Sequence, residues 1–228
     1  MASPARKHFE RTSAASSQAA ESDSPRDANG YELMLHKLAT DKRRLKEVQS
    51  MERKAEVKRE ILPEYEPWIE GVLIGNQGVQ DDVLMAVMVW RIDAGDLTGA
   101  LVIARYAIEH KLAMPDQYKR GTACLLAEEF SDIALRNMAS TEQTADDLAA
   151  LGLVLQEVDE LTSAEDMPDE VRAKLHKAIG LTLATTDQAG ALEHLKRAFG
   201  LHDKVGVKKD IEKLERELKN LADAPSAG

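Results

Sequence analysis

Residues 81–115 have the sequence DDVLMAVMVWRIDAGDLTGALVIARYAIEHKLAMP. Apolar residues fill its first half, and Asp81 and Asp82 stand just before them, where carboxylates cap free amides and favour the helix dipole. Gly95 is a typical helix terminator, a second apolar stretch follows at once, and Pro115 ends it. The stretch therefore predicts two consecutive helices joined by a tight turn.

The rest of the chain continues this pattern. Apolar residues recur at helical spacing over 121–140, 143–163, 166–185, 189–202 and 205–221, and no long segment alternates with a period of two residues. Aromatic residues make up only 4% of the 228 residues, while Ala, Leu, Glu and Lys are abundant, a mixture that suits helices better than sheets. The sequence therefore predicts an all-α fold.

Two stretches of the chain resemble each other at a distance of 91 residues. They are AGDLTGALVIARYAIEH, from residue 94, and TTDQAGALEHLKRAFGLH, from residue 185. Ile179 and Gly180, with Ala191 and Ala198 after them, match part of the tetratricopeptide pattern, although His176 replaces its tryptophan. The repeat predicts antiparallel helical hairpins that are tetratricopeptide-like in part, and two generic hairpins are the alternative.

The N-terminal quarter differs from this body. Residues 1–30 hold few large apolar residues, so we expect a mostly disordered arm. Residues 31–62 contain neither Gly nor Pro and predict one long basic helix, and 63–80 predict a connector rich in Gly and Pro. The helical-hairpin body then spans 81–221, and 222–228 is expected to be a disordered tail.

Charge separates the same regions. Residues 1–60 hold 13 Lys and Arg against 10 Asp and Glu, whereas the remaining residues hold 17 against 30. The single cysteine, Cys124, excludes an internal disulfide, and its apolar neighbours favour a buried thiol. No apolar run approaches the roughly 18 residues that a membrane span needs, so no membrane association is expected.

Motifs for catalysis or cofactor binding are not recognisable in the sequence. It has no phosphate-binding GxxxxGK[ST] loop, no GxSxG elbow, and no His or Cys spacing typical of a zinc site. The acidic pairs at 81–82, 146–147, 165–166 and 169–170 stand near helix starts, where capping explains them without a metal-dependent nuclease. We therefore expect no cofactor and no metal.

The basic helix is the best candidate for a functional site. Its cations, with those of the N-terminal arm, would contact DNA phosphates with salt-sensitive affinity. The alternative is a solvated coiled-coil face with ion pairs to the interleaved glutamates. The predicted DNA-binding residues are Arg6, Lys7, Arg11, Lys42, Arg43, Arg44, Lys46, Arg53, Lys54 and Lys58.

Four blocks of the sequence resemble a known family. They are SPARKHFERTSA (3–14), QDDVLMAVMVWRIDAGDLTGALVIARYAIEH (80–110), AEDMPDEVRAKLHKAIGL (164–181) and GVKKDIEKLERELK (206–219). These blocks are similar to the small terminase subunits of temperate tailed phages with cohesive-ended genomes. The resemblance extends over nearly all of 1–221.

This resemblance implies a role in viral DNA packaging. The expected partners are double-stranded viral DNA, a large terminase subunit that carries the ATPase, and further copies of the chain, which would form a homo-oligomer of unknown size, with a ring as one option. The expected location is the host cytoplasm. Members of this type are often described as an endonuclease subunit, so cutting of the cohesive-end site is an alternative function. A helical-repeat adaptor that binds protein alone is a further alternative.

Overall fold

The computed structural model describes residues 3–17, 25–115, 118–140 and 144–223. Within these ranges every regular element is helical, so the predicted all-α fold is confirmed. The helices divide between an N-terminal unit, Met1–Thr122, and a C-terminal unit, Ala123–Gly228. They are α1 (Pro4–Ser17), α2 (Pro25–Glu47), α3 (Met51–Ile61), the 3-10 helix η1 (Leu62–Glu64), α4 (Glu66–Gly75), α5 (Asp82–Ala94), α6 (Leu97–Glu109), α7 (Thr122–Met138), α8 (Ala145–Thr162), α9 (Asp169–Leu183), α10 (Gln188–Leu201) and α11 (Lys208–Asp223).

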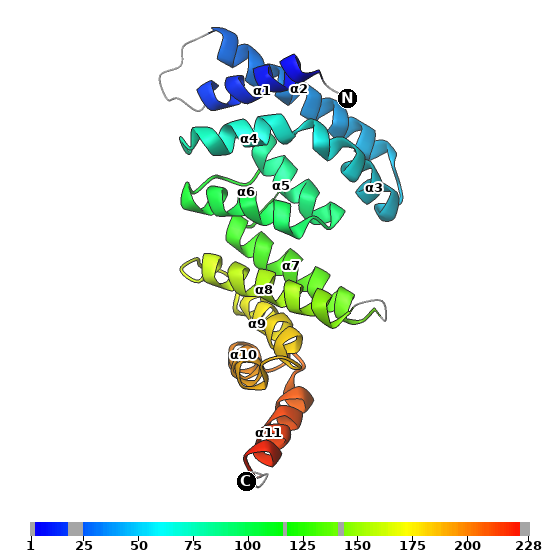
Figure 1. Cartoon of the computed structure of the whole chain (residues 1–228), viewed down its shortest axis with the longest axis vertical. Helices are drawn as coiled ribbons and strands as arrows, with labels where there is room; N and C mark the ends of the chain where they lie inside the picture. The colour runs from blue at the N-terminus through cyan, green and yellow to red at the C-terminus, as the bar shows by residue number, and fades with distance from the viewer. Residues whose placement is uncertain (1–2, 18–24, 116–117, 141–143, 224–228) are drawn as a thin grey trace. The chain divides into compact units, whose positions relative to one another are not determined.

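Small residues allow α1 to lie directly against α4 in the N-terminal unit (Figure 1). A side chain at Gly71 of α4 would collide with the backbone of Arg11, because its Cβ would lie 2.3 Å from that carbonyl oxygen. Ala14 of α1 is fully buried at the same contact. This helix corrects the prediction of a disordered arm for residues 4–17. The Ala and Ser residues bury little surface each, but they permit a close approach of two backbones. Residues 18–24 lie outside the described ranges.

The predicted helix over 31–62 is divided at residues 48–50 into α2 and α3. Arg44 and Glu60 form an ion pair of 2.7 Å across this elbow, whereas 16 residues of continuous helix would separate them by about 24 Å. Ser50 caps α3 by accepting a hydrogen bond from the backbone amide of Arg53 at 3.3 Å. The bend lets Leu45 of α2 and Val57 of α3 both become buried, with both helices against α5.

Part of the predicted connector is also helical, since α4 occupies residues 66–75. Pro67 stands in its first turn, where a missing N–H is harmless. Gly71 and Gly75 are needed inside α4 because α1 passes close to both. The glycines that indicated a loop in the sequence therefore mark a helix contact. The predicted tail differs as well, because α11 extends to Asp223, and residues 224–228 lie outside the described part of the chain.

The two repeated stretches form helical hairpins that begin their second helices in the same way. Asp96 caps α6 by accepting from the amide of Gly99 at 2.9 Å, and Asp187 caps α10 by accepting from the amide of Gly190 at the same distance. The hairpin contacts are α5 with α6 and α9 with α10. Four alanines that match across the repeat are fully buried: Ala100, Ala107, Ala191 and Ala198. The hairpins are confirmed, whereas membership of the tetratricopeptide class stays a prediction.

Several smaller predictions concern buried side chains. Cys124 is buried, as expected. Trp90 is 7% exposed and Trp68 is fully buried, so neither indole face is open for stacking on a nucleic-acid base. No helix among the described residues combines the length and apolar character of a membrane span.

Candidate DNA-binding surface

Helix α2 carries four of the ten predicted DNA-binding residues, more than any other helix, and is anchored by one buried face. Met34, Leu38 and Leu45 lie on this face at helical spacing. Asp41 lies among them and accepts a hydrogen bond of 2.7 Å from the hydroxyl of Tyr65. This buried face leaves two flanks of α2 on either side, and their charges differ.

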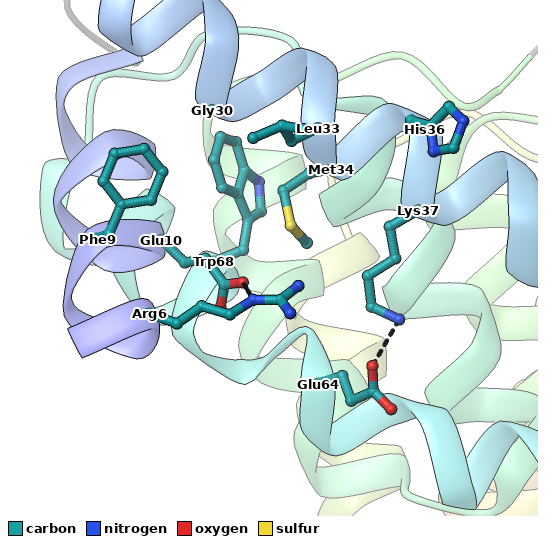
Figure 2. A pocket seen from close by; sticks show the side chains of 10 residues that line it. All are labelled: Arg6, Phe9, Glu10, Gly30, Leu33, Met34, His36, Lys37, Glu64 and Trp68. Carbon is teal, nitrogen blue, oxygen red and sulfur yellow. Dashed lines mark hydrogen bonds and ion pairs between the residues drawn. The ribbon is translucent and has the colours of Figure 1, made fainter. Parts of the chain in front are cut away.

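The flank that faces α3 and η1 is neutralised. The ammonium group of Lys37 lies 2.8 Å from Asp41 and 2.9 Å from Glu64, and it covers the ring of Tyr65 at 4.6 Å. Figure 2 shows Lys37 reaching across to Glu64. Arg44 lies on the same flank and forms its ion pair with Glu60. The positive charges of this flank are therefore compensated within the chain.

The opposite flank of α2 carries Lys42, Arg43 and Lys46, which we call the basic flank. At 100° per residue these three positions fall within an arc of about 100°. Arg43 and Lys46 are exposed and Lys42 is half-buried. Arg43 donates to the carbonyl oxygen of Ala39 and to the Thr40 hydroxyl, but no carboxylate of the described residues forms an ion pair with any of the three. The basic flank thus presents three uncompensated charges.

The predicted residues of α3 are engaged inside the protein to different degrees. Arg53 forms an ion pair of 2.6 Å with Glu56, whose hydrogen bond raises the pKa of Arg53. Lys58 is only 9% exposed, and its ammonium group is paired with Asp93 of α5. Lys54 is half-buried. Lys58 is therefore buried, and its charge is compensated inside the N-terminal unit.

Of the predicted residues of α1, only Arg6 lines the cavity between α1 and α2. Arg6 donates to Glu10 at 2.7 Å, and Arg11 forms an ion pair of 2.6 Å with Glu70. Lys7 is exposed and has no ion pair among the described residues. The cavity, of about 550 Å³, has Trp68 at its base, and Figure 2 shows Arg6 and Phe9 beside it. Its walls combine apolar side chains with paired charges.

Sequence reasoning missed the cations that hold the unit together. Arg59 donates to the carbonyl oxygen of Ala94 at 3.0 Å, and Arg91 is paired with Glu66 and Asp96. Their partners lie on other helices, so no local pattern in the sequence reveals these contacts. Charge density along the chain is therefore a poor guide to which cations remain uncompensated.

The acidic pairs act as caps where the structure describes their hydrogen bonds. Asp81 accepts from the amides of Val83 and Leu84 and from the indole N–H of Trp68, at 2.8–2.9 Å. Burial raises the pKa of Asp81 against the lowering effect of these bonds. Asp147 forms a reciprocal capping box with Thr144, which lowers the pKa of that carboxyl. Capping thus accounts for both carboxylates, as predicted.

The C-terminal unit is strongly acidic. It carries 12 Lys and Arg against 21 Asp and Glu, whereas the N-terminal unit carries 18 against 19. The acidic excess of the C-terminal unit repels a polyanion such as DNA, whereas the nearly neutral N-terminal unit does not. A DNA contact is therefore favoured on the N-terminal unit, where the basic flank lies.

Comparison with known proteins identifies the family of the chain. A sequence model of the phage small terminase subunit matches residues 35–170, which include α3 to α8 and the C-terminal part of α2. The chain is 50% identical over 220 residues to a protein of Escherichia phage P2 named "Terminase, endonuclease subunit", and this match covers 96% of the chain and 87% of the relative. No solved structure matches. The chain therefore belongs to the phage small terminase subunit family.

Proposed function

We propose that this small subunit of a DNA-packaging terminase binds the packaging-site DNA through the basic flank of α2. Three charges there, on Lys42, Arg43 and Lys46, have no carboxylate partner among the described residues. Cations that are free of ion pairs can displace counterions from a duplex, whereas paired ones must first break their own contacts. This difference between the two flanks of α2 is the observation that carries the proposal.

The remaining predicted residues take secondary roles in this proposal. Lys7 and Lys54 extend the contact, since neither has an ion pair among the described residues. Four arginines must break an ion pair before they can bind a phosphate, which costs energy. They are Arg6, Arg11, Arg44 and Arg53. Lys58 stays with Asp93 and is left out of the contact.

The acidic C-terminal unit serves a different partner in the proposal. We assign it to assembly with further copies of the chain and to the large subunit that carries the ATPase, within the host cytoplasm. Its net charge disfavours DNA. Measuring the solution mass of the chain, alone and with the large subunit, tests this assignment. A chain that stays monomeric and does not bind the large subunit would contradict it.

Charge reversal of the basic flank tests the DNA contact. The triple variant Lys42→Glu, Arg43→Glu, Lys46→Glu is expected to bind packaging-site DNA at least about tenfold more weakly at constant salt, because it loses about three phosphate contacts. Fluorescence anisotropy with labelled duplex measures the affinity. These side chains form no ion pairs within the described residues, so the variant is expected to fold.

A matched control separates a local contact from net charge. Lys209, Lys213 and Lys219 are exposed on α11, and their reversal changes the net charge by the same amount. The control is expected to bind DNA like the wild type. Equal affinity for wild type and the basic-flank variant would overturn the proposal and leave α2 with a structural role.

Cutting of DNA by the chain itself is the second candidate function. The name of the phage P2 relative, at 50% identity over 96% of this chain, favours it. Purified protein is incubated with cohesive-end site DNA and Mg²⁺ in the absence of the large subunit. Site-specific nicks would establish this activity, and intact DNA would leave cutting to another component.

A further inference from the structure

Three potential metal ligands from three different helices meet in the C-terminal unit. Asp159 lies on α8, His176 on α9 and His194 on α10. The Nδ1 atoms of the two histidines are 3.0 Å apart, and the Nδ1 of His176 is 3.8 Å from Oδ2 of Asp159. All three potential ligand atoms lie within 4.8 Å of one another. Among the described residues, this is the one such group.

These distances are close to those on the coordination sphere of a tetrahedral zinc ion. With zinc–nitrogen bonds of about 2.0–2.1 Å, two ligands at the tetrahedral angle are about 3.3 Å apart. The histidine nitrogens are slightly nearer than this, and Oδ2 of Asp159, 3.8 Å from Nδ1 of His176, is slightly farther. The three atoms already lie within 4.8 Å of one another, so side-chain adjustments alone can bring them to the spacing of a zinc site.

The second oxygen of Asp159 is already held by another residue. Arg172 lies 3.7 Å from Oδ1, and the same guanidinium donates to the carbonyl oxygens of Thr162 and Glu165 at 2.9 Å. This contact leaves Oδ2 on the side of His176. Outer contacts of this kind orient metal ligands and fix their rotamers.

The environment keeps His176 in the form that binds a metal. Its side chain is 12% exposed, and this burial is the main reason that the pKa of His176 is lowered. The charges of His194, Arg197 and Arg172 lower this pKa further, and Asp159 opposes them. A neutral imidazole with a free lone pair is the metal-binding form.

We propose that Asp159, His176 and His194 bind one Zn²⁺ ion, which joins α8, α9 and α10. Imidazole and carboxylate are both established zinc ligands, and a water molecule completes the tetrahedron. On binding, each histidine carries its remaining proton on Nε2. Linear motifs do not reveal the site because its members are separated by 17 and 18 residues.

Zinc content of the full-length protein tests the proposal. Protein that has been stripped with a chelator is dialysed against zinc, freed of unbound metal and measured by atomic emission. We expect about one zinc per chain for the wild type, and less than a tenth of this for His176→Gln and for His194→Gln. Asp159→Asn is expected to bind zinc more weakly while keeping the shape of the side chain.

His202→Gln is the matched control, because His202 lies in the same unit and 3.9 Å from Glu170 without a second histidine. It is expected to retain the full zinc content. Circular dichroism establishes that each variant is folded, and zinc is expected to raise the Tm of the wild type but not of His194→Gln. Wild-type protein without zinc, or undiminished zinc in both histidine variants, would overturn the proposal.

Discussion

At the scale of single residues, Asp81 shows how one carboxylate serves several parts of the N-terminal unit. It is 1% exposed and caps α5 through two backbone amides, and it also accepts from the indole of Trp68 on α4. Trp68 in turn stacks on Tyr31 of α2, with ring centroids 5.8 Å apart. The cap was predictable from the sequence, because an aspartate stands directly before an apolar helix. Its bond to Trp68 was not, because nothing local indicates which helix passes above it.

Removing this carboxylate is expected to destabilise the protein strongly. Asp81→Ala leaves two helix amides and a buried indole N–H without an acceptor. The expected loss is about 2–4 kcal/mol, from about 1 kcal/mol for the cap and about 1–3 kcal/mol for the buried donor. Urea unfolding monitored by tryptophan fluorescence measures it. The neighbouring Asp82→Ala, at an exposed position, is the control and is expected to cost less than about 1 kcal/mol. Equal losses for both variants would contradict the assigned role of Asp81.

At the scale of helices, the sequence predicted which segments are helical better than it predicted where helices bend or meet. Apolar periodicity located α5 to α11 because their buried faces follow the helical repeat. The elbow between α2 and α3 was missed because Ser50 is an unremarkable residue in a helical pattern, and its capping role depends on packing against α5. Helices α1 and α4 were missed because Gly and Ala were interpreted as loop or arm residues, whereas they allow contact between two helices.

The α9–α10 hairpin provides a test of such a contact. A Cβ at Gly180 would lie 2.7 Å from the buried side chain of Leu195 and 3.0 Å from the carbonyl oxygen of Ala191. Gly180→Ala is therefore expected to destabilise the C-terminal unit by about 1–3 kcal/mol through overpacking. Thermal and urea unfolding both measure this change.

Gly200→Ala is the matched control in the same hairpin. Gly200 lies within α10, and an added Cβ meets nothing within 4 Å. Alanine favours the helix there, so the expected change is a gain of about 0.5–1 kcal/mol. If Gly180→Ala were as stabilising as the control, the two helices would not approach as closely as described.

At the scale of the whole molecule, the two units differ in charge, with 18 Lys and Arg against 19 Asp and Glu in the N-terminal unit and 12 against 21 in the C-terminal unit. The basic excess of residues 1–60 was visible in the sequence, but ion pairs with Glu60, Glu64 and Asp93 neutralise several of these cations. The sequence could therefore predict the region of the candidate site, but it could not predict which residues form it. Which cations stay uncompensated depends on helices that meet only in the folded chain.

The number of uncompensated cations sets the expected salt dependence of DNA binding. Three phosphate contacts from the basic flank give a slope of about −3 for log affinity against log salt, for each chain that engages the duplex, and further contacts from Lys7 and Lys54 make it about −4.5. Between 50 and 200 mM salt, the affinity should then fall by at least about 40-fold. Anisotropy titrations across this range measure the slope. A slope near zero would contradict the proposal that the basic flank contacts DNA. A slope of about −9 would also contradict it, because that value requires every predicted cation to bind a phosphate.

The polar anchor at Asp41 has a consequence for how the chain meets its partner. Tyr65 and Lys37 fix this carboxylate on the inner face of α2, the helix whose other flank carries the uncompensated cations. A helix secured in this way docks as a rigid body, so the encounter orders only side chains and no backbone. Association should accordingly proceed with a small change in heat capacity, unlike the large one that accompanies a segment folding onto its target.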